Sequence, residues 1–332
     1  MIHYFKLALF LSFQMSRRAY RKEILLAVLC VIVILQLTKN VIFGGDNDDQ
    51  RFHYSVVGQE NVSEIHPTCK IERNLRIISY NIRCQYFNPF SIWNFNERIE
   101  RLVEGIKDFD IALVQEAYVV NAGLGVISEC ASRLVTTMSK HGFHYRTSIA
   151  DFMAPYVGKS GGIAIFSRIP LTRATSRQFQ SFSFFQYTDY MGFVIGEYIV
   201  NSRHLYVVNT HLDPSRPATR IMQAKELTSA TRNYTISSAY VILGGDFNID
   251  NRYPTLSNSS EEYIELLRTM KEAGLRSVFP SRIETNIDGG NYDAIFASSN
   301  IAVVRKEIIK LETASKALVS DHFGLAIELK LL

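Results

Sequence analysis

The stretch that decides the fold is residues 241–250, VILGGDFNID in one-letter code. It begins with an apolar run and two glycines, and a short apolar run bounded by turn residues predicts a buried β-strand. Asp246 and Asn248 stand at the end of this run. Because side chains two residues apart on a strand point to the same side, these two are expected to face one spot. There they can hold a water molecule and a phosphoryl oxygen; the plainer interpretation is a strand that ends in an Asx turn.

Other apolar runs in the chain end in the same way. The segments are IISYN, IALVQE, LYVVNTH and, before the last apolar run, SDH, and the polar residues at their ends are Asn81, Glu116, His211, Asp321 and His322. A single polar residue after a strand is most often a hydrogen-bonded surface group or a helix cap. The repetition of the pattern favours a shared functional site.

Six segments, in the order SYN, QE, NTHLD, GGDFNID, YDAIFA and SDH, resemble the motifs of the endonuclease/exonuclease/phosphatase superfamily, whose fold is that of DNase I. Each segment is short, but the ordered set across 73–332 is specific. The resemblance implies a four-layer α/β/β/α sandwich. From the residues alone, the mixture of helical and strand periodicity predicts only the α/β class.

The periodicity also places individual elements. Residues 94–107 carry apolar side chains at helical spacing, namely Ile99, Leu102, Val103 and Ile106, which predicts an amphipathic helix leading to a strand at 111–115. Further helices are expected over 126–140, 216–232 and 261–273, and further strands over 161–167, 193–200, 205–210 and 240–244 and near Ala294 and Phe323.

One branch of the superfamily is also indicated. The segments KSGGIAIFSRIP (159–170), YMGF (190–193) and RIMQAKEL (220–227) look like those of the neutral sphingomyelinases. This resemblance implies hydrolysis of sphingomyelin to ceramide and phosphocholine. Lys159, close to two glycines, would then place its ammonium group against the substrate phosphate; the alternative is a solvated lysine in a turn.

The superfamily pattern implies a Mg²⁺ ion at the strand ends. Glu116 would be its primary ligand, because Mg²⁺ is a hard cation that prefers oxygen atoms. Asn81 would help to hold the metal shell or a phosphate oxygen. Asp321 would be a carboxylate on the metal side.

The same pattern implies in-line attack of water on a phosphodiester. Asp246 and Asn248 would orient the water and the oxygens of the transition state. His322 would be the general base, with its other ring nitrogen held by Asp293. His211 would donate a proton or a hydrogen bond on the substrate side. Imidazole suits both tasks because its unperturbed pKa lies near neutrality.

The amino-terminal region divides by hydropathy. Residues 1–23 are a short basic and apolar segment, 24–43 a predicted transmembrane signal-anchor, and 44–72 a polar linker to the catalytic domain at 73–332. The basic residues within 16–22 favour a cytoplasmic amino terminus and a lumenal or extracellular catalytic domain. A cleaved signal peptide, which would give a secreted protein, and a buried core helix are the alternatives.

Sequons and cysteines bear on the same question of compartment. Three Asn-X-Ser/Thr sequons follow the predicted span and predict a glycoprotein; their asparagines are Asn61, Asn233 and Asn258. Of the four cysteines, Cys30 lies in the predicted span. The others, Cys69, Cys84 and Cys130, allow one disulfide and one free thiol, with the pairing left open.

The composition narrows the classes of function. With 47% hydrophobic and 20% charged residues, the chain is globular rather than disordered. A net charge of +4 gives no polybasic surface, which disfavours a nuclease and predicts no stable nucleic-acid partner. The aromatic-rich residues 179–193 are either sheet core or a surface that enters a bilayer interface.

The leading prediction is therefore a membrane-anchored, Mg²⁺-dependent phosphodiesterase that acts on a phospholipid in a membrane. A nuclease or a phosphoinositide phosphatase of the same fold is the first alternative. A lipid-binding module without catalytic activity is an alternative from a different class.

Overall fold

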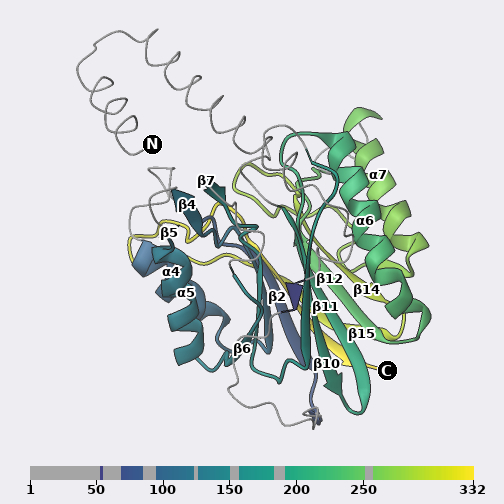
Figure 1. The fold of residues 1–332 in the computed structure, drawn as a ribbon, viewed down its shortest axis with the longest axis horizontal. Helices are drawn as coiled ribbons and strands as arrows, with labels where there is room; N and C mark the ends of the chain where they lie inside the picture. The colour runs from purple at the N-terminus through teal and green to yellow at the C-terminus, as the bar shows by residue number, and fades with distance from the viewer. Residues whose placement is uncertain are drawn as a thin grey trace, which may run out of the picture. The chain divides into compact units, whose positions relative to one another are not determined.

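The structure is a computed structural model of the chain, and it describes residues 53–54, 69–84, 95–122, 126–149, 157–182, 191–250 and 257–332. Within these residues, two large β-sheets pack face to face and helices cover their outer faces (Figure 1). The predicted α/β class is confirmed.

The first large sheet has seven strands. Their order is β1 (His53–Tyr54), β9 (Arg173–Gln178), β10 (Gly192–Val200), β11 (Arg203–His211), β12 (Tyr240–Asp246), β14 (Asp293–Ser298) and β13 (Leu275–Ser277). β11 and β12 run parallel, while β14 runs antiparallel to β12. The end of β12 therefore lies beside the end of β11 and the beginning of β14.

The second large sheet has six strands, and a small third sheet has three. The order in the second is β15 (Ile301–Ile309), β16 (Gly324–Leu331), β2 (Leu75–Asn81), β3 (Ile111–Gln115), β8 (Ala164–Ser167) and β6 (Tyr145–Arg146). The third sheet is β5 (Val126–Ile127), β4 (Val120–Ala122) and β7 (Val157–Lys159). β2 and β3 are parallel, and β16 runs antiparallel to β2.

Two pairs of helices complete the layers. α4 (Phe95–Ile106) and α5 (Glu129–Lys140) pack on the second sheet, and α6 (Pro217–Ile236) and α7 (Ser257–Glu272) pack on the first. Three separate apolar clusters fill the two helix–sheet interfaces and the interface between the sheets. This arrangement is the four-layer α/β/β/α sandwich that the family resemblance implies.

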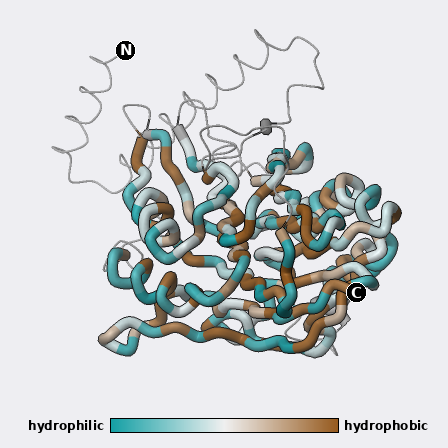
Figure 2. The backbone as a smooth tube through the Cα atoms, turned by 90° about the horizontal axis from the view of Figure 1, so that it is seen from below, coloured by the Kyte–Doolittle hydropathy of each residue, from teal (hydrophilic) through white to brown (hydrophobic). Residues whose placement is uncertain are grey.

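The sequence periods explain these interfaces. In α4 the buried residues are Ile99, Leu102, Val103 and Ile106, which form one face of the helix. On β2 the alternation of side chains places Ile77 between the sheets and Ile78 against the helices, so the strand is apolar on both faces. Figure 2 shows long apolar, brown stretches along the strands and alternating colours along the helices.

The two glycines of residues 241–250 allow close backbone packing at the end of β12. A Cβ atom on Gly244 would lie 2.8 Å from Leu113 Cδ1 on the opposite sheet. Gly245 has a φ of +149°, and a Cβ atom there would collide with the carbonyl oxygen of Thr210 on β11. Glycine at both positions brings the end of β12 close to β11 in its own sheet and to β3 of the facing sheet.

Several polar segments differ from the sequence expectations. The helix predicted over 126–140 begins at Glu129, because Val126–Ile127 forms strand β5 beside β4. Strands β9 and β15 are not predicted by periodicity, since charged and hydroxyl side chains interrupt their apolar pattern. Pairing with neighbouring strands outweighs this weak local preference.

Part of the predicted linker belongs to the sheets. His53–Tyr54 forms β1, which pairs with β9, and Cys69 makes a β-bridge with Val200. The predicted anchor at 24–43 lies outside the described residues. Among the helices that are described, none combines the length and the hydropathy needed to cross a bilayer.

The structure resolves the cysteine pairing. Cys84, after β2, forms a disulfide with Cys130 on α5, with a Cα–Cα distance of 6.1 Å, while Cys69 is a half-buried free thiol. A bond that closes a loop with a sequence separation of 46 stabilises the folded state by about 4 kcal/mol. It ties the segment after β2 to the helical layer.

Candidate active site

Strand register gathers the polar strand ends at one edge of the sandwich. In the first sheet, His211 is the register partner of Asp246, and Asp246 is the partner of Asp293. In the second sheet, Asn81 is level with Gln115, the residue before Glu116. Residues 320–322 precede β16 and reach the same edge, because β16 runs antiparallel to β2.

The Asn81 amide joins the two sheets. Its Nδ2 donates hydrogen bonds to Glu116 Oε1 at 3.1 Å and to Asp246 Oδ2 at 2.9 Å. Asn81 is fully buried and Asp246 is 1% exposed, so this contact is shielded from solvent. One neutral amide thus sits between two carboxylates that come from different sheets.

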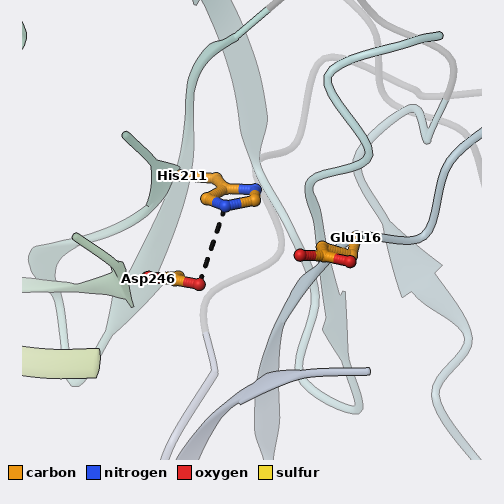
Figure 3. Close-up of side chains that lie close together, drawn as sticks. All are labelled: Glu116, His211 and Asp246. Carbon is orange, nitrogen blue, oxygen red and sulfur yellow. Dashed lines mark ion pairs between the residues drawn. The ribbon is translucent and has the colours of Figure 1, made fainter. Parts of the chain in front are cut away.

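Two imidazoles approach the same carboxylate oxygen. His211 Nε2 lies 3.6 Å from Asp246 Oδ2, and His322 Nε2 lies 3.7 Å from it. Figure 3 shows the His211 ring and the Asp246 carboxylate facing each other, with the Glu116 carboxylate directed toward the space beside them. Asp246 Oδ2 is therefore the common contact of the site.

His322 and Asp293 form a buried pair. Their contact joins His322 Nδ1 and Asp293 Oδ2 at 2.8 Å. Burial by itself lowers the pKa of His322, but the carboxylates of Asp293 and Asp246 outweigh it and raise that pKa to about 10. Burial raises the pKa of Asp293, with a further contribution from Asp246. In this arrangement Asp293 fixes the ring orientation and leaves Nε2 facing the centre of the site.

The backbone is strained next to these groups. Glu116 and Asn248 have φ angles of 59° and 53°, in the left-handed region that residues other than glycine rarely adopt. The Asn248 amide N–H donates to Asp246 Oδ1 at 2.8 Å, and its Nδ2 donates to the Leu212 carbonyl at 2.9 Å. Asn248 thus links the end of β12 to the loop that follows His211.

A buried polar pair supports the site from below. Gln115 Nε2 donates to Asn209 Oδ1 at 2.7 Å, and Asn209 Nδ2 donates to the carbonyls of Val114 and Ala164 on the opposite sheet. The sequence motifs contain both residues, but no role was predicted for them. The signal that could have identified them is a polar residue inside an apolar run, one or two positions before a site residue.

Two predicted residues lie at the edge of the cluster. Asp321 forms an ion pair with Arg83. The neighbouring Ser320 Oγ donates a hydrogen bond to the Asn81 carbonyl at 2.7 Å. The same Oγ lies 3.4 Å from Asp321 Oδ1. Lys159 lies on β7 of the third sheet, with its Nζ 4.3 Å from the centroid of the Tyr118 ring. Contact of Lys159 with a phosphate stays a prediction.

The cluster fits a divalent cation. The side chains of Glu116, His211 and Asp246 offer one ligand atom each, and these atoms lie within 4.8 Å of one another. Asp246, Asp293 and His322 form a second such group around the same carboxylate. Two buried carboxylates that share one amide donor repel each other, and a cation between them relieves that repulsion.

The chain matches the Endonuclease/Exonuclease/phosphatase family over residues 78–322. Sphingomyelinase C of Bacillus cereus is 23% identical over an alignment of 211 residues, and the match covers 59% of this chain and 63% of the relative. The match thus covers less than two thirds of that relative's length.

Solved structures share the fold. A beta toxin mutant from Staphylococcus aureus with bound magnesium ions superposes with a TM-score of 0.59 at 19% identity, covering 77% of this chain and all of that chain. An endonuclease/exonuclease/phosphatase from Beutenbergia cavernae DSM 12333 gives 0.59 at 18% identity, with coverages of 78% and 72%. The six motifs all fall within residues 78–322, and the chain belongs to the endonuclease/exonuclease/phosphatase family.

Proposed function

We propose that this protein is a Mg²⁺-dependent phosphodiesterase that hydrolyses a membrane phospholipid, and that the substrate is sphingomyelin. The observation that carries the proposal is the convergence of Glu116, His211 and His322 on one buried carboxylate, Asp246. The choice of substrate is supported by the similarity to Sphingomyelinase C of Bacillus cereus and by the sequence segments of the neutral sphingomyelinase branch.

In this proposal Glu116 and Asp246 would hold the metal ion, with Asn81 next to both. Asp321, which is paired with Arg83, would lie on the metal side of the site. A bound Mg²⁺ ion supplies positive charge that neutralises the phosphoryl oxygens. With a cation bound beside Asp246, the neighbouring carboxylates would raise the pKa of His322 less, and the neutral imidazole that a base requires would be favoured.

His322 and His211 move the protons. His322 Nε2 accepts a proton from the attacking water, while Asp293 holds its Nδ1. The water oxygen forms a bond to phosphorus, and the bond from phosphorus to the ceramide oxygen breaks. His211 gives a proton to that leaving oxygen, so the products are ceramide and phosphocholine. Asp246 and Asn248 orient the water, and Lys159 contacts the phosphate.

The first prediction concerns metal binding without turnover. Mg²⁺ should raise the melting temperature of the wild type, by an amount equivalent to about 2.7 kcal/mol at 100 times the dissociation constant. Glu116→Gln removes one of two neighbouring carboxylates, so it should be more stable than the wild type in EDTA and lose the response to Mg²⁺. Glu272→Gln, on the outer end of α7, is the control and should respond like the wild type. An unchanged Mg²⁺ response in Glu116→Gln would rule out Glu116 as a ligand.

The second prediction is the substrate. The protein is incubated with four substrates, each in Mg²⁺ and in EDTA: sphingomyelin, a lysophospholipid, a phosphoinositide and double-stranded DNA. Phosphocholine should be released from sphingomyelin in the presence of Mg²⁺ and not in the presence of EDTA. Cleavage of DNA alone would identify a nuclease, and release of inorganic phosphate from the phosphoinositide would identify a phosphatase. Binding of lipid vesicles with no product from any substrate would identify a module without activity.

The third prediction separates the two histidines from their supports. His322→Ala and His211→Ala should each lower kcat by roughly 10²- to 10⁴-fold. Asp293→Asn should cost less than His322→Ala, because the imidazole remains and only its tautomer and orientation are released. The double histidine variant should lose far less than the product of the two single losses, since the groups act in one step. Turnover like that of the wild type in His322→Ala would remove the general-base role.

The fourth prediction is the compartment. We propose that residues 24–43 anchor the protein with its catalytic domain lumenal or extracellular, and a secreted form is the alternative. The Cys84–Cys130 disulfide supports an oxidising compartment. The protein is alkylated in intact eukaryotic cells and its peptides are mapped; Cys84 and Cys130 should react with the alkylating reagent only after a reductant is added. In a separate experiment, intact microsomes should protect the catalytic domain from added protease. Alkylation of both thiols without reductant would contradict the proposal.

A further inference from the structure

Arg98 lies on α4, and its half-buried side chain carries a guanidinium group into the apolar layer between this helix and the second sheet. It donates hydrogen bonds to three backbone carbonyls. Nε contacts the Val319 carbonyl at 2.6 Å, and Nη2 contacts those of Ile82 at 2.7 Å and Arg83 at 3.2 Å. Its surroundings include Tyr80, Ile99 and Leu102, so a positive charge is held among apolar side chains.

The three carbonyls belong to the two segments that carry the halves of the site. Residues 82–84 follow Asn81, and the amides of Ile82 and Cys84 donate to the carbonyls of Gln115 and Glu116, each at 3.1 Å. Val319 precedes the segment 320–322, which carries His322. Arg98 thus links the Asn81–Glu116 half of the site to the His322 half.

The chemistry of the guanidinium suits this link. Its N–H groups lie in one plane with fixed directions, so it can set the separation of carbonyls on two different segments. A lysine at the same place is a flexible point charge and cannot bind three carbonyls in a fixed geometry. Burial lowers the pKa of Arg98, which reflects the cost of placing its charge here.

We propose that Arg98 is a positioning residue of the active site, which sets the distance between the Asn81–Glu116 segment and the His322 segment. The inference rests on the proposed function for its effect on turnover. Its effects on backbone protection and on metal binding do not depend on the substrate.

The second sheet offers a matched control in Arg168. Arg168 follows β8 and donates to the carbonyls of Phe109 at 3.0 Å, Lys107 and His141, at the opposite end of the same helical layer. Arg98 and Arg168 therefore perform the same structural task on backbone carbonyls, but only Arg98 is linked to site segments. Loss of stability alone would affect both positions alike.

The experiment compares Arg98→Lys with Arg168→Lys in the full chain. Both should lower the melting temperature by a similar amount. Arg98→Lys alone should increase hydrogen exchange at residues 82–84 and 319–322. It should also raise the dissociation constant for Mg²⁺, obtained from the Mg²⁺-dependent rise in melting temperature, by roughly 10- to 100-fold. The kcat on sphingomyelin should fall by a similar factor of roughly 10- to 100-fold.

The role of Arg98 is overturned if its lysine variant changes exchange, Mg²⁺ binding and kcat no more than Arg168→Lys does. If Arg98→Lys does not fold, Arg98→Gln is compared with Arg168→Gln instead, because glutamine keeps a planar N–H donor but lacks the guanidinium fork that reaches two segments. Faster exchange at 82–84 and 319–322 in Arg98→Gln than in Arg168→Gln then supports the proposal, and equal exchange in the two variants overturns it. Weaker Mg²⁺ binding in Arg98→Lys than in Arg168→Lys, together with no turnover of sphingomyelin by the wild type, would leave the positioning role intact and refute the proposed function.

Discussion

The site depends on one contact, in which the Asn81 amide donates to Glu116 of the second sheet and to Asp246 of the first. Apolar contacts between the two sheets have no direction, so they specify the relative position of the sheets less sharply than a hydrogen bond does. A buried hydrogen bond does have a direction, and breaking it leaves polar groups unpaired away from water. Asn81 therefore fixes the two strand ends against each other at the place where both carboxylates are needed.

The electrostatics of the cluster follow from this geometry. Asp246 and Asp293 are register partners on adjacent strands, and both are buried. Burial lowers the pKa of His322, but the carboxylates gathered here outweigh it, and the same carboxylates give the cluster groups that could hold a cation. Such a cluster is costly for folding alone, and perturbed groups of this kind concentrate at functional sites. The left-handed backbone at Glu116 and Asn248 adds to that cost in the same place.

The sequence was sufficient for the central part of this arrangement. Apolar runs predicted β2, β3, β11 and β12, and they placed Asp246 at the end of β12. The two-residue strand period does not extend to Asn248, because its backbone N–H donates to Asp246 Oδ1, as in the Asx-turn alternative. The pairing of Cys84 with Cys130 and the contact of Asp321 with Arg83 were not predictable, because they join residues far apart in the chain without a local pattern. The edge strand β15 was missed because its exposed face carries charges, which look like a loop in sequence.

The supporting contacts share a further feature, since each apolar interface contains a polar link that leads to the site. Between the two sheets, the polar link is the hydrogen bond from Gln115 to Asn209. Between the second sheet and its helices, the polar link is Arg98, which donates to the Val319 carbonyl. Between the first sheet and its helices, Arg220 donates to the Asp213 carbonyl at 3.1 Å and Gln223 accepts from the Asp213 amide at 2.8 Å, two residues after His211. Apolar packing alone tolerates small shifts of a side chain, whereas these directed bonds do not. The sandwich thus holds each segment of the site from the layer directly behind it.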